Sequence, residues 1–170
     1  LPDGKPAWKA RVSTEVVAPP RVSDGVVIVF TGDGNLHALN AADGTRKWVS
    51  QRVTPALIVR NYAGGIVHRG GLFFGTPGGH LLAMDLKTGI IGWDATVANP
   101  KGATELERIA DVTSLPLILD KDVCAIAYQG RVACFDLVRG TLQWSRDISS
   151  LTNMAADAKY GVVQTQRGVM

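Results

Sequence analysis

The chain has 170 residues, of which 46% are hydrophobic and 19% are charged, so it has the composition of a globular protein and not of a disordered one. Its net charge is only +3, and its basic residues form no block interleaved with aromatic side chains, which argues against a nucleic-acid-binding surface. No stretch approaches the ~18 apolar residues that a membrane-spanning helix requires.

Short β-rich runs separated by turn residues predict an all-β fold. Taken in chain order, the buried second strands of successive units are predicted at 26–30, 72–74 and 123–128. A candidate first strand precedes each of them, at 16–22, 65–69 and 114–119. The prolines in the first and last of these segments suit strand starts or edges, because proline has no N–H for a central ladder. A long loop contains one further element, a short helical turn predicted at 104–110.

Four tryptophans reveal an internal repeat. Each lies four residues after a glycine, in the pairs Gly4 and Trp8, Gly44 and Trp48, Gly89 and Trp93, and Gly140 and Trp144. The tryptophans are 40, 45 and 51 residues apart, close to the length of a four-stranded propeller blade. In the last three units an earlier glycine and then an Asn or Asp recur at fixed offsets, as Gly34 and Asn40, Gly79 and Asp85, and Gly130 and Asp136. Agreement at this many offsets predicts a β-propeller.

Each repeated position has a physical role. The earlier glycine closes the hairpin between the second and third strands, where a positive φ is needed. The Asn or Asp ends the third strand and is expected to bind the backbone of the next turn. The later glycine turns the chain into the outermost strand. There the tryptophan is expected to cap the blade with its ring, while its indole N–H binds a carbonyl.

The repeat divides the chain into about four blade-equivalents of four strands each. The predicted units are 1–14 as the outer strand of a preceding blade, 15–53, 60–98 and 112–149 as blades, and 152–170 as an incomplete blade. A half-ring would expose an apolar blade face at each end. We weigh three closures: a longer native chain, which we favour, two copies that complete one ring, or a small four-bladed ring closed by its own ends.

Cys124 and Cys134 lie on the two arms of one predicted hairpin. Their spacing fits neither a zinc site nor a redox Cys-x-x-Cys motif. A cross-strand disulfide needs the two residues to face each other, and the turn at Gln129 and Gly130 does not guarantee that register. Two buried free thiols are therefore the expected state.

Over essentially the whole chain, the small-x-Asp-x-x-x-Gly-x-x-x-Trp repeat resembles the quinoprotein-alcohol-dehydrogenase-like propeller repeat. That superfamily contains both enzymes and scaffolds, so a quinone-dependent dehydrogenase is the main alternative function. Such an enzyme would need calcium ligands, a catalytic aspartate and, in the alcohol-dehydrogenase type, an adjacent cysteine pair. Here the cysteines are ten residues apart, and Asp43, Asp85 and Asp136 lie at repeat turns.

The three histidines give no support to catalysis either. His37, His68 and His80 lie on different predicted strands without catalytic or metal-ligand spacing, and His37 and His80 are expected to face solvent. We therefore expect a non-enzymatic protein with no catalytic residue, cofactor or metal. A third alternative is a generic recognition propeller of the WD type, but only Trp93 is followed by the aspartate of that signature.

Two stretches resemble the central region of the BamB family more closely: residues 54–60, and residues 102–112 followed by 127–130. This resemblance implies an eight-bladed ring, of which the chain would form about the middle half. It also implies a lipoprotein scaffold of the outer-membrane β-barrel assembly machinery at the periplasmic face of the bacterial outer membrane, held there by an N-terminal lipid outside this chain. Its implied partner is BamA, through the POTRA domains. Exposed sheet edges add unfolded outer-membrane proteins as expected clients.

The same resemblance places the partner-binding site in two loops. A Leu-x-Leu-Arg element aligns with Leu57, Val59 and Arg60, and the first of two acidic residues aligns with Asp111, whereas the second falls on Thr113. From the residues alone, Leu57 and Val59 either form a docking loop or fill the gap between blades. Asp111 either joins that docking site or caps a turn before the next strand.

Overall fold

A computed structural model describes residues 3–55, 57–59, 64–157, 159–165 and 168–169. In these residues the fold is all β and contains no helix, hence none that could cross a membrane. The strands form four antiparallel sheets, each built in chain order. The first sheet contains β1 (Arg21–Ser23), β2 (Val26–Phe30), β3 (Leu36–Asn40) and β4 (Arg46–Ser50), and the second contains β5 (Gly65–His68), β6 (Gly71–Thr76), β7 (His80–Asp85) and β8 (Ile91–Thr96). The third contains β9 (Leu117–Leu119), β10 (Asp122–Ile126), β11 (Val132–Asp136) and β12 (Leu142–Arg146), and the last contains β13 (Met154–Ala156), β14 (Gly161–Thr165) and β15 (Gly168–Val169).

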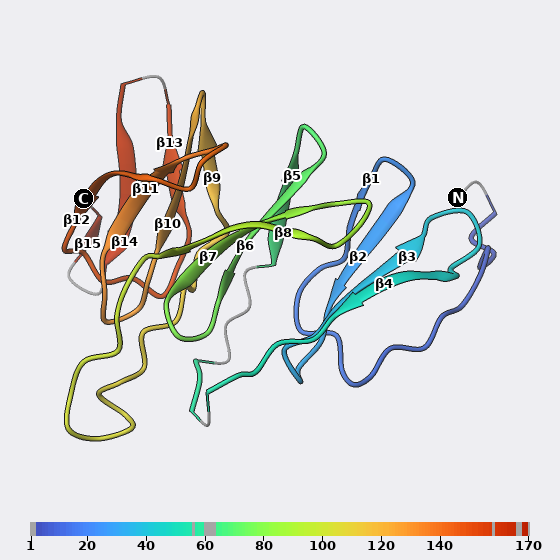
Figure 1. The fold of residues 1–170 in the computed structure, drawn as a ribbon, viewed down its shortest axis with the longest axis horizontal. Helices are drawn as coiled ribbons and strands as arrows, with labels where there is room; N and C mark the ends of the chain where they lie inside the picture. Colours follow the sequence, from blue (N-terminus) through green and yellow to red (C-terminus); the bar gives the residue numbers. More distant parts are fainter. Residues whose placement is uncertain (1–2, 56, 60–63, 158, 166–167, 170) are drawn as a thin grey trace.

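The sheets stand side by side along the long axis of the molecule (Figure 1). Their first strands form the common inner edge, because β1 contacts β5 and β9 contacts β13. Four-stranded meanders arranged in this way are propeller blades, so the predicted fold class is confirmed. The first and last sheets lie at opposite ends of the long axis, so the described residues do not form the small four-bladed ring.

Two predicted first strands are shorter in the structure than in the sequence prediction. The segment 16–22 yields only β1, preceded by an isolated bridge between Val16 and Thr31, and the segment 114–119 yields only β9. Prolines remove the backbone donors from the missing parts. In addition, the Ser114 hydroxyl accepts the Ile126 N–H at 2.9 Å, so a side chain replaces the ladder partner there.

The turns between third and fourth strands follow the predicted chemistry. The Asp85 carboxylate accepts the backbone N–H groups of Thr88 at 2.8 Å and Lys87 at 3.1 Å, and Gly89 N–H donates to the Asp85 carbonyl at 2.9 Å. The hydrogen bonds from Thr88 hold the pKa of the Asp85 carboxyl below its ordinary value. The helical turn expected at 104–110 is present as a single turn, in which Arg108 N–H donates to the Thr104 carbonyl at 3.2 Å.

Three of the four repeat tryptophans, Trp8, Trp48 and Trp93, pack against the following blade, which corrects the expectation that each caps its own. The Trp48 indole N–H donates to the Leu86 carbonyl at 3.1 Å, and a Cβ added to Gly89 would lie 2.7 Å from the Trp48 ring. The same two contacts join Trp8 to Ala41 and Gly44, and Trp93 to Leu137 and Gly140. The repeat glycine of one blade therefore provides the space into which the tryptophan of the preceding blade packs. Trp144 makes no such contact with a following blade among the described residues and is 50% exposed.

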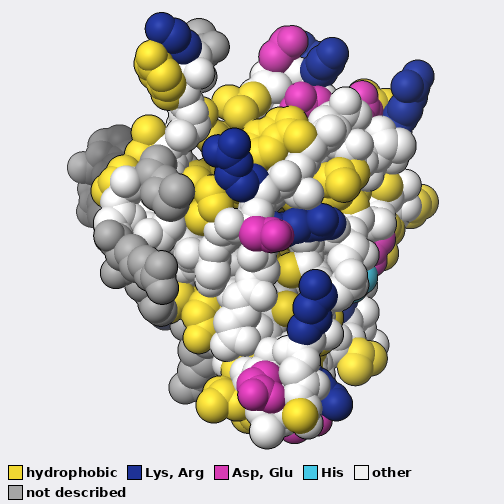
Figure 2. Space-filling model, turned by 90° about the vertical axis from the view of Figure 1, so that its left-hand side faces the viewer, with side chains coloured by type: hydrophobic (Ala, Val, Ile, Leu, Met, Phe, Trp, Pro, Cys, Tyr) yellow, Lys and Arg dark blue, Asp and Glu magenta, His cyan; other side chains and the backbone are white. Residues whose placement is uncertain are grey.

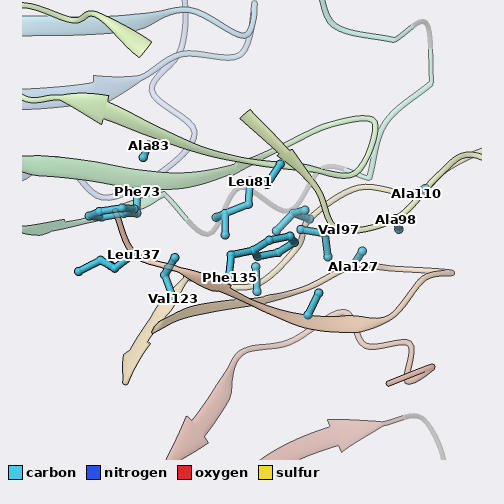
Figure 3. Packing of buried hydrophobic residues seen from close by; sticks show 14 residues of the cluster. Phe73, Leu81, Ala83, Val97, Ala98, Ala110, Val123, Ala127, Phe135 and Leu137 are labelled. Carbon is cyan, nitrogen blue, oxygen red and sulfur yellow. The ribbon is translucent and has the colours of Figure 1, made fainter. Parts of the chain in front are cut away.

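The hydrophobic core lies between the sheets. Figure 3 shows the cluster that joins the second sheet to the third, with Phe73 and Leu81 facing Val123 and Phe135. Small residues such as Ala83 and Ala133 complete this interface and allow the two sheets to approach. The core is thus shared between neighbours rather than enclosed within one blade.

The expectation of free cysteines is wrong, because Cys124 and Cys134 form a disulfide. The two residues are direct partners in the β10–β11 ladder, with their Cα atoms 4.0 Å apart. The ladder closes at the pair Ile126 and Val132, so the connecting residues 127–131 set the register that the sequence left undetermined.

Candidate functional site

The connections between successive sheets run along one side of the molecule, the lower side in Figure 1. The first linker comprises residues 51–64 and the second residues 97–116, and the β2–β3 and β6–β7 turns lie at the same side. The predicted partner-binding residues belong to these two linkers. One face therefore collects segments that are far apart in the sequence.

A buried carboxylate ties the two linkers together. Asp111 lies in the second linker, and its side chain accepts the Val59 N–H at 2.5 Å through Oδ2 and the Gly78 N–H at 2.9 Å through Oδ1. Only 4% of Asp111 is exposed. Burial raises the pKa of its carboxyl above the ordinary value, while the hydrogen bonds from Gly78 and Val59 oppose that rise.

The residues beside this carboxylate differ in exposure. Leu57 is 48% exposed, whereas Val59 is half-buried. Arg60 lies outside the described residues. The structure thus brings Val59 and Asp111 together and leaves Leu57 accessible. Asp111 bridges two linkers and one turn, which neither of the two expectations for it included.

Thr113 faces the interior. It is buried, and its hydroxyl donates to the Ser150 carbonyl at 2.8 Å. This position therefore joins the second linker to the segment after the third sheet and cannot present a group to a partner.

A cavity of about 400 Å³ lies beside the first linker, between the first and second sheets. At its rim Asp94 accepts a hydrogen bond from the ring of His80, with Nδ1 and Oδ1 2.7 Å apart, and forms an ion pair with Arg52, whose Nη2 lies 3.7 Å from Oδ2. This cluster could not be predicted from the sequence, because Arg52 and Asp94 belong to different blades. The only local signal is that His80 and Asp94 lie on neighbouring strands.

The histidines do not behave alike. The His80 side chain is partly exposed. His37 is buried, and its Nε2 lies 3.0 Å from the Ser13 hydroxyl, so the expectation that His37 faces solvent is wrong. Burial lowers the pKa of His37. Among the described residues, no group of three or more His, Cys, Asp or Glu side chains could hold a metal ion.

Figure 2 shows the end of the molecule nearest the last sheet. Its lysine and arginine side chains lie apart from one another, some of them beside an acidic side chain, and form no continuous basic patch on this face.

Comparison with known proteins identifies the family. The family model described as "Outer membrane protein assembly factor BamB" matches residues 2–170. A protein of that name from Nitrosomonas eutropha is 49% identical over 154 residues, which are 91% of this chain and 38% of the relative. Another from Bordetella pertussis is 42% identical over 168 residues, 98% of this chain and 44% of the relative. The chain thus spans less than half the length of these curated relatives.

Solved structures agree on the fold. BamB from Moraxella catarrhalis superposes with a TM-score of 0.91 at 25% identity, over 98% of this chain and 51% of that one. A quinohemoprotein alcohol dehydrogenase from Comamonas testosteroni reaches a TM-score of 0.65 at 21% identity over 82% of this chain and 22% of its own, which shows a shared fold alone. On the match of the family model to nearly all its residues, the chain belongs to the BamB family of outer membrane protein assembly factors.

Proposed function

We propose that this chain is part of a non-enzymatic scaffold for outer-membrane protein assembly, located at the periplasmic face of the outer membrane. It binds the POTRA domains of BamA through the first linker, with Leu57 and Arg60 as contact residues. The names of its relatives support the assembly role. The absence of any assignable catalytic constellation from the sequence supports the scaffold role over the dehydrogenase alternative.

The observation that carries this proposal is the pair of hydrogen bonds that the Asp111 carboxylate accepts from Val59 and Gly78. Leu57 is half exposed although it is large and apolar, and two residues later the backbone is fixed by the bond from Val59 N–H to Asp111. An apolar side chain held on an ordered backbone loses little conformational freedom when it binds, so more of the interaction energy appears as affinity. The hydrogen bond between Val59 and Asp111 thus orders the backbone next to Leu57.

The disulfide is consistent with the proposed compartment. Structural disulfides persist in the bacterial periplasm and are rare in the cytosol. Cys124 and Cys134 form a disulfide that is buried in the third sheet, as a structural disulfide is. The same chain in a reducing compartment would lose this crosslink.

The test is a binding titration of the full-length protein with the POTRA domains of BamA. We expect the double substitution Leu57→Ala with Arg60→Ala to weaken binding at least about tenfold, as loss of an apolar and an arginine contact does at interfaces. The matched control is Val138→Ala with Arg139→Ala, which removes the same chemistry from an exposed turn at the opposite end of a sheet. Unchanged affinity in the first variant, or equal loss in both, would contradict the proposed site.

A further inference from the structure

The cavity between the first two sheets has an aromatic floor. Phe30 at the end of β2 and Phe74 on β6 form it, with their rings edge to face and 5.7 Å between centroids. Leu36 on β3 completes the floor, and all three side chains are buried. A cavity of about 400 Å³ is large enough for a small ligand or one large side chain.

The first linker forms one wall of this cavity. Thr54 packs on the β2–β3 turn, so closely that a Cβ on Gly34 would lie 2.4 Å from its methyl carbon. Pro55 lies beside the β6–β7 turn at Gly78, whose added Cβ would be 3.7 Å away. The linker therefore spans the turns of two blades and leaves the mouth between them open at Val53, which is 100% exposed.

Arg52, at the rim of the cavity, has N–H donors beyond those that its ion pair with Asp94 requires. Arg52 makes one described ion pair, with Asp94 at 3.7 Å, although a guanidinium has five N–H donors. Its side chain is partly exposed at the mouth. An acidic group on an incoming chain could therefore bind Arg52 without displacing Asp94.

The mouth is continuous with the segment proposed to bind BamA. Gly78 lines the cavity and donates its N–H to the same carboxylate that accepts the Val59 N–H. Val53, Pro55 and Leu57 are all exposed and lie within five residues of one another. An apolar surface beside a pocket is typical of the centre of a protein–protein interface, where an anchor side chain buried in the pocket supplies most of the binding energy.

We infer that this interblade cavity receives one aromatic side chain of the protein partner, flanked by an acidic residue that pairs with Arg52. This inference rests on the proposed function, because the occupant is a segment of the same partner that contacts Leu57. The aromatic ring stacks on the Phe30 and Phe74 floor, and the carboxylate stays at the solvated rim.

The first experiment uses the POTRA binding titration of the full-length protein. Val53→Asp places a negative charge at the mouth without touching the core, and Val138→Asp is its matched control on a turn where the valine is 83% exposed. We expect a loss of about tenfold or more from Val53→Asp and none from the control. If Leu57→Ala with Arg60→Ala weakens binding while Val53→Asp does not, the cavity inference is wrong and the proposed function stands. If neither variant weakens binding, both are wrong.

A second experiment does not depend on BamA. The probes are two dipeptides, acetyl-Asp-Phe-amide and acetyl-Lys-Phe-amide, titrated into the protein and followed by amide NMR shifts. We expect shifts centred on Thr54, Gly75 and Gly78 with the acidic dipeptide, and binding several-fold weaker with the basic one, as charge pairing at an exposed rim allows. Arg52→Gln should abolish that preference. Equal binding of the two dipeptides, or shifts scattered over other sheets, would overturn the inference.

Discussion

Glycine and tryptophan form one unit in this repeat, although they belong to different blades. Gly89 has a φ of +74°, which disfavours any side chain, and the Trp48 ring occupies the space where a side chain would begin. Either constraint alone would select glycine. Because both hold at Gly44, Gly89 and Gly140, the repeat spacing records how one blade docks on the next.

Replacement of Gly89 by alanine separates the two constraints. A positive φ costs an alanine about 1–2 kcal/mol, and displacement of the Trp48 ring adds about 1–3 kcal/mol of overpacking. Gly25→Ala is the control, since Gly25 has a φ of +73° but nothing within 4 Å of its added Cβ. Urea unfolding should show the larger loss in unfolding free energy for Gly89→Ala. Equal losses would mean that the tryptophan contact contributes nothing to the choice of glycine.

Asp111 gives the protein a pH response opposite to that of its other shifted carboxylates. Its folded pKa is raised above the ordinary 3.8, so between 3.8 and the folded pKa the native state binds more protons than the unfolded state. Its contribution to the free energy of unfolding therefore falls as pH rises through that window and is constant above it. Asp85 and Asp136 have lowered pKa values and contribute stability that is lost as pH falls.

The difference between the wild type and Asp111→Asn isolates this effect, because the other carboxylates are common to both proteins. We expect the free energy of unfolding of the wild type, minus that of the variant, to decrease as pH rises from 3.8 and then to level off. Urea titrations at a series of pH values measure it. A difference that increased with pH would show that the two backbone hydrogen bonds outweigh burial and lower the pKa of Asp111 instead.

At the scale of the element, the disulfide crosslinks the hairpin of β10 and β11, which carries buried residues of the third sheet. Closing a loop of this length stabilises a protein by about 2–3 kcal/mol through the entropy of the unfolded chain. The double variant Cys124→Ala with Cys134→Ala should lose about that amount in urea unfolding. Reductant should lower the midpoint of the wild type and leave the variant unchanged. A wild type whose thiols are shown to be reduced, yet whose midpoint is unchanged, would contradict this role.

The linkers, and not the strands, carry the candidate site. Strand side chains in this fold are committed to contacts between neighbouring sheets, as Phe73 and Phe135 are. The linkers cross from the outer edge of one sheet to the inner edge of the next, so a single side chain there can bind two blades. Asp111 does this by accepting hydrogen bonds from Val59 and Gly78. The site is ordered because it is also part of how the blades are joined.

Across the whole molecule, what the sequence could predict was local. The second and third strands and the turn at Asp85 follow from alternation and turn chemistry within about ten residues. The contacts that join blades do not, since Trp48 and Leu86 are 38 residues apart and Val59 and Asp111 are 52 apart. The disulfide was missed for a related reason, because it depends on a register that the loop sets. Resemblance to a family located Leu57 and Asp111, but only the structure shows that one is exposed and the other buried.

The four sheets share different amounts of buried apolar surface with their neighbours, and this difference predicts the order in which they unfold locally. The second and third sheets share a large buried cluster, whereas the last sheet has three strands, mostly exposed, and meets the third through a small set of buried residues: Ile126, Val132 and Val163. A cavity of about 910 Å³ lies between the third and last sheets. Fewer buried contacts lower the free energy of local opening.

Hydrogen exchange of the 170-residue chain should therefore show β6, β7, β10 and β11 as the slowest segments and β13–β15 as the fastest of the strands. The disulfide strengthens the contrast, because it crosslinks β10 to β11, whereas the last sheet contains no cysteine and so no disulfide. Reduction should speed exchange in β10 and β11 while the rates in β13–β15 change little. If β13–β15 were instead as protected as β10 and β11, the small cluster around Val163 would have to hold the last sheet as firmly as the full interface holds the second sheet to the third.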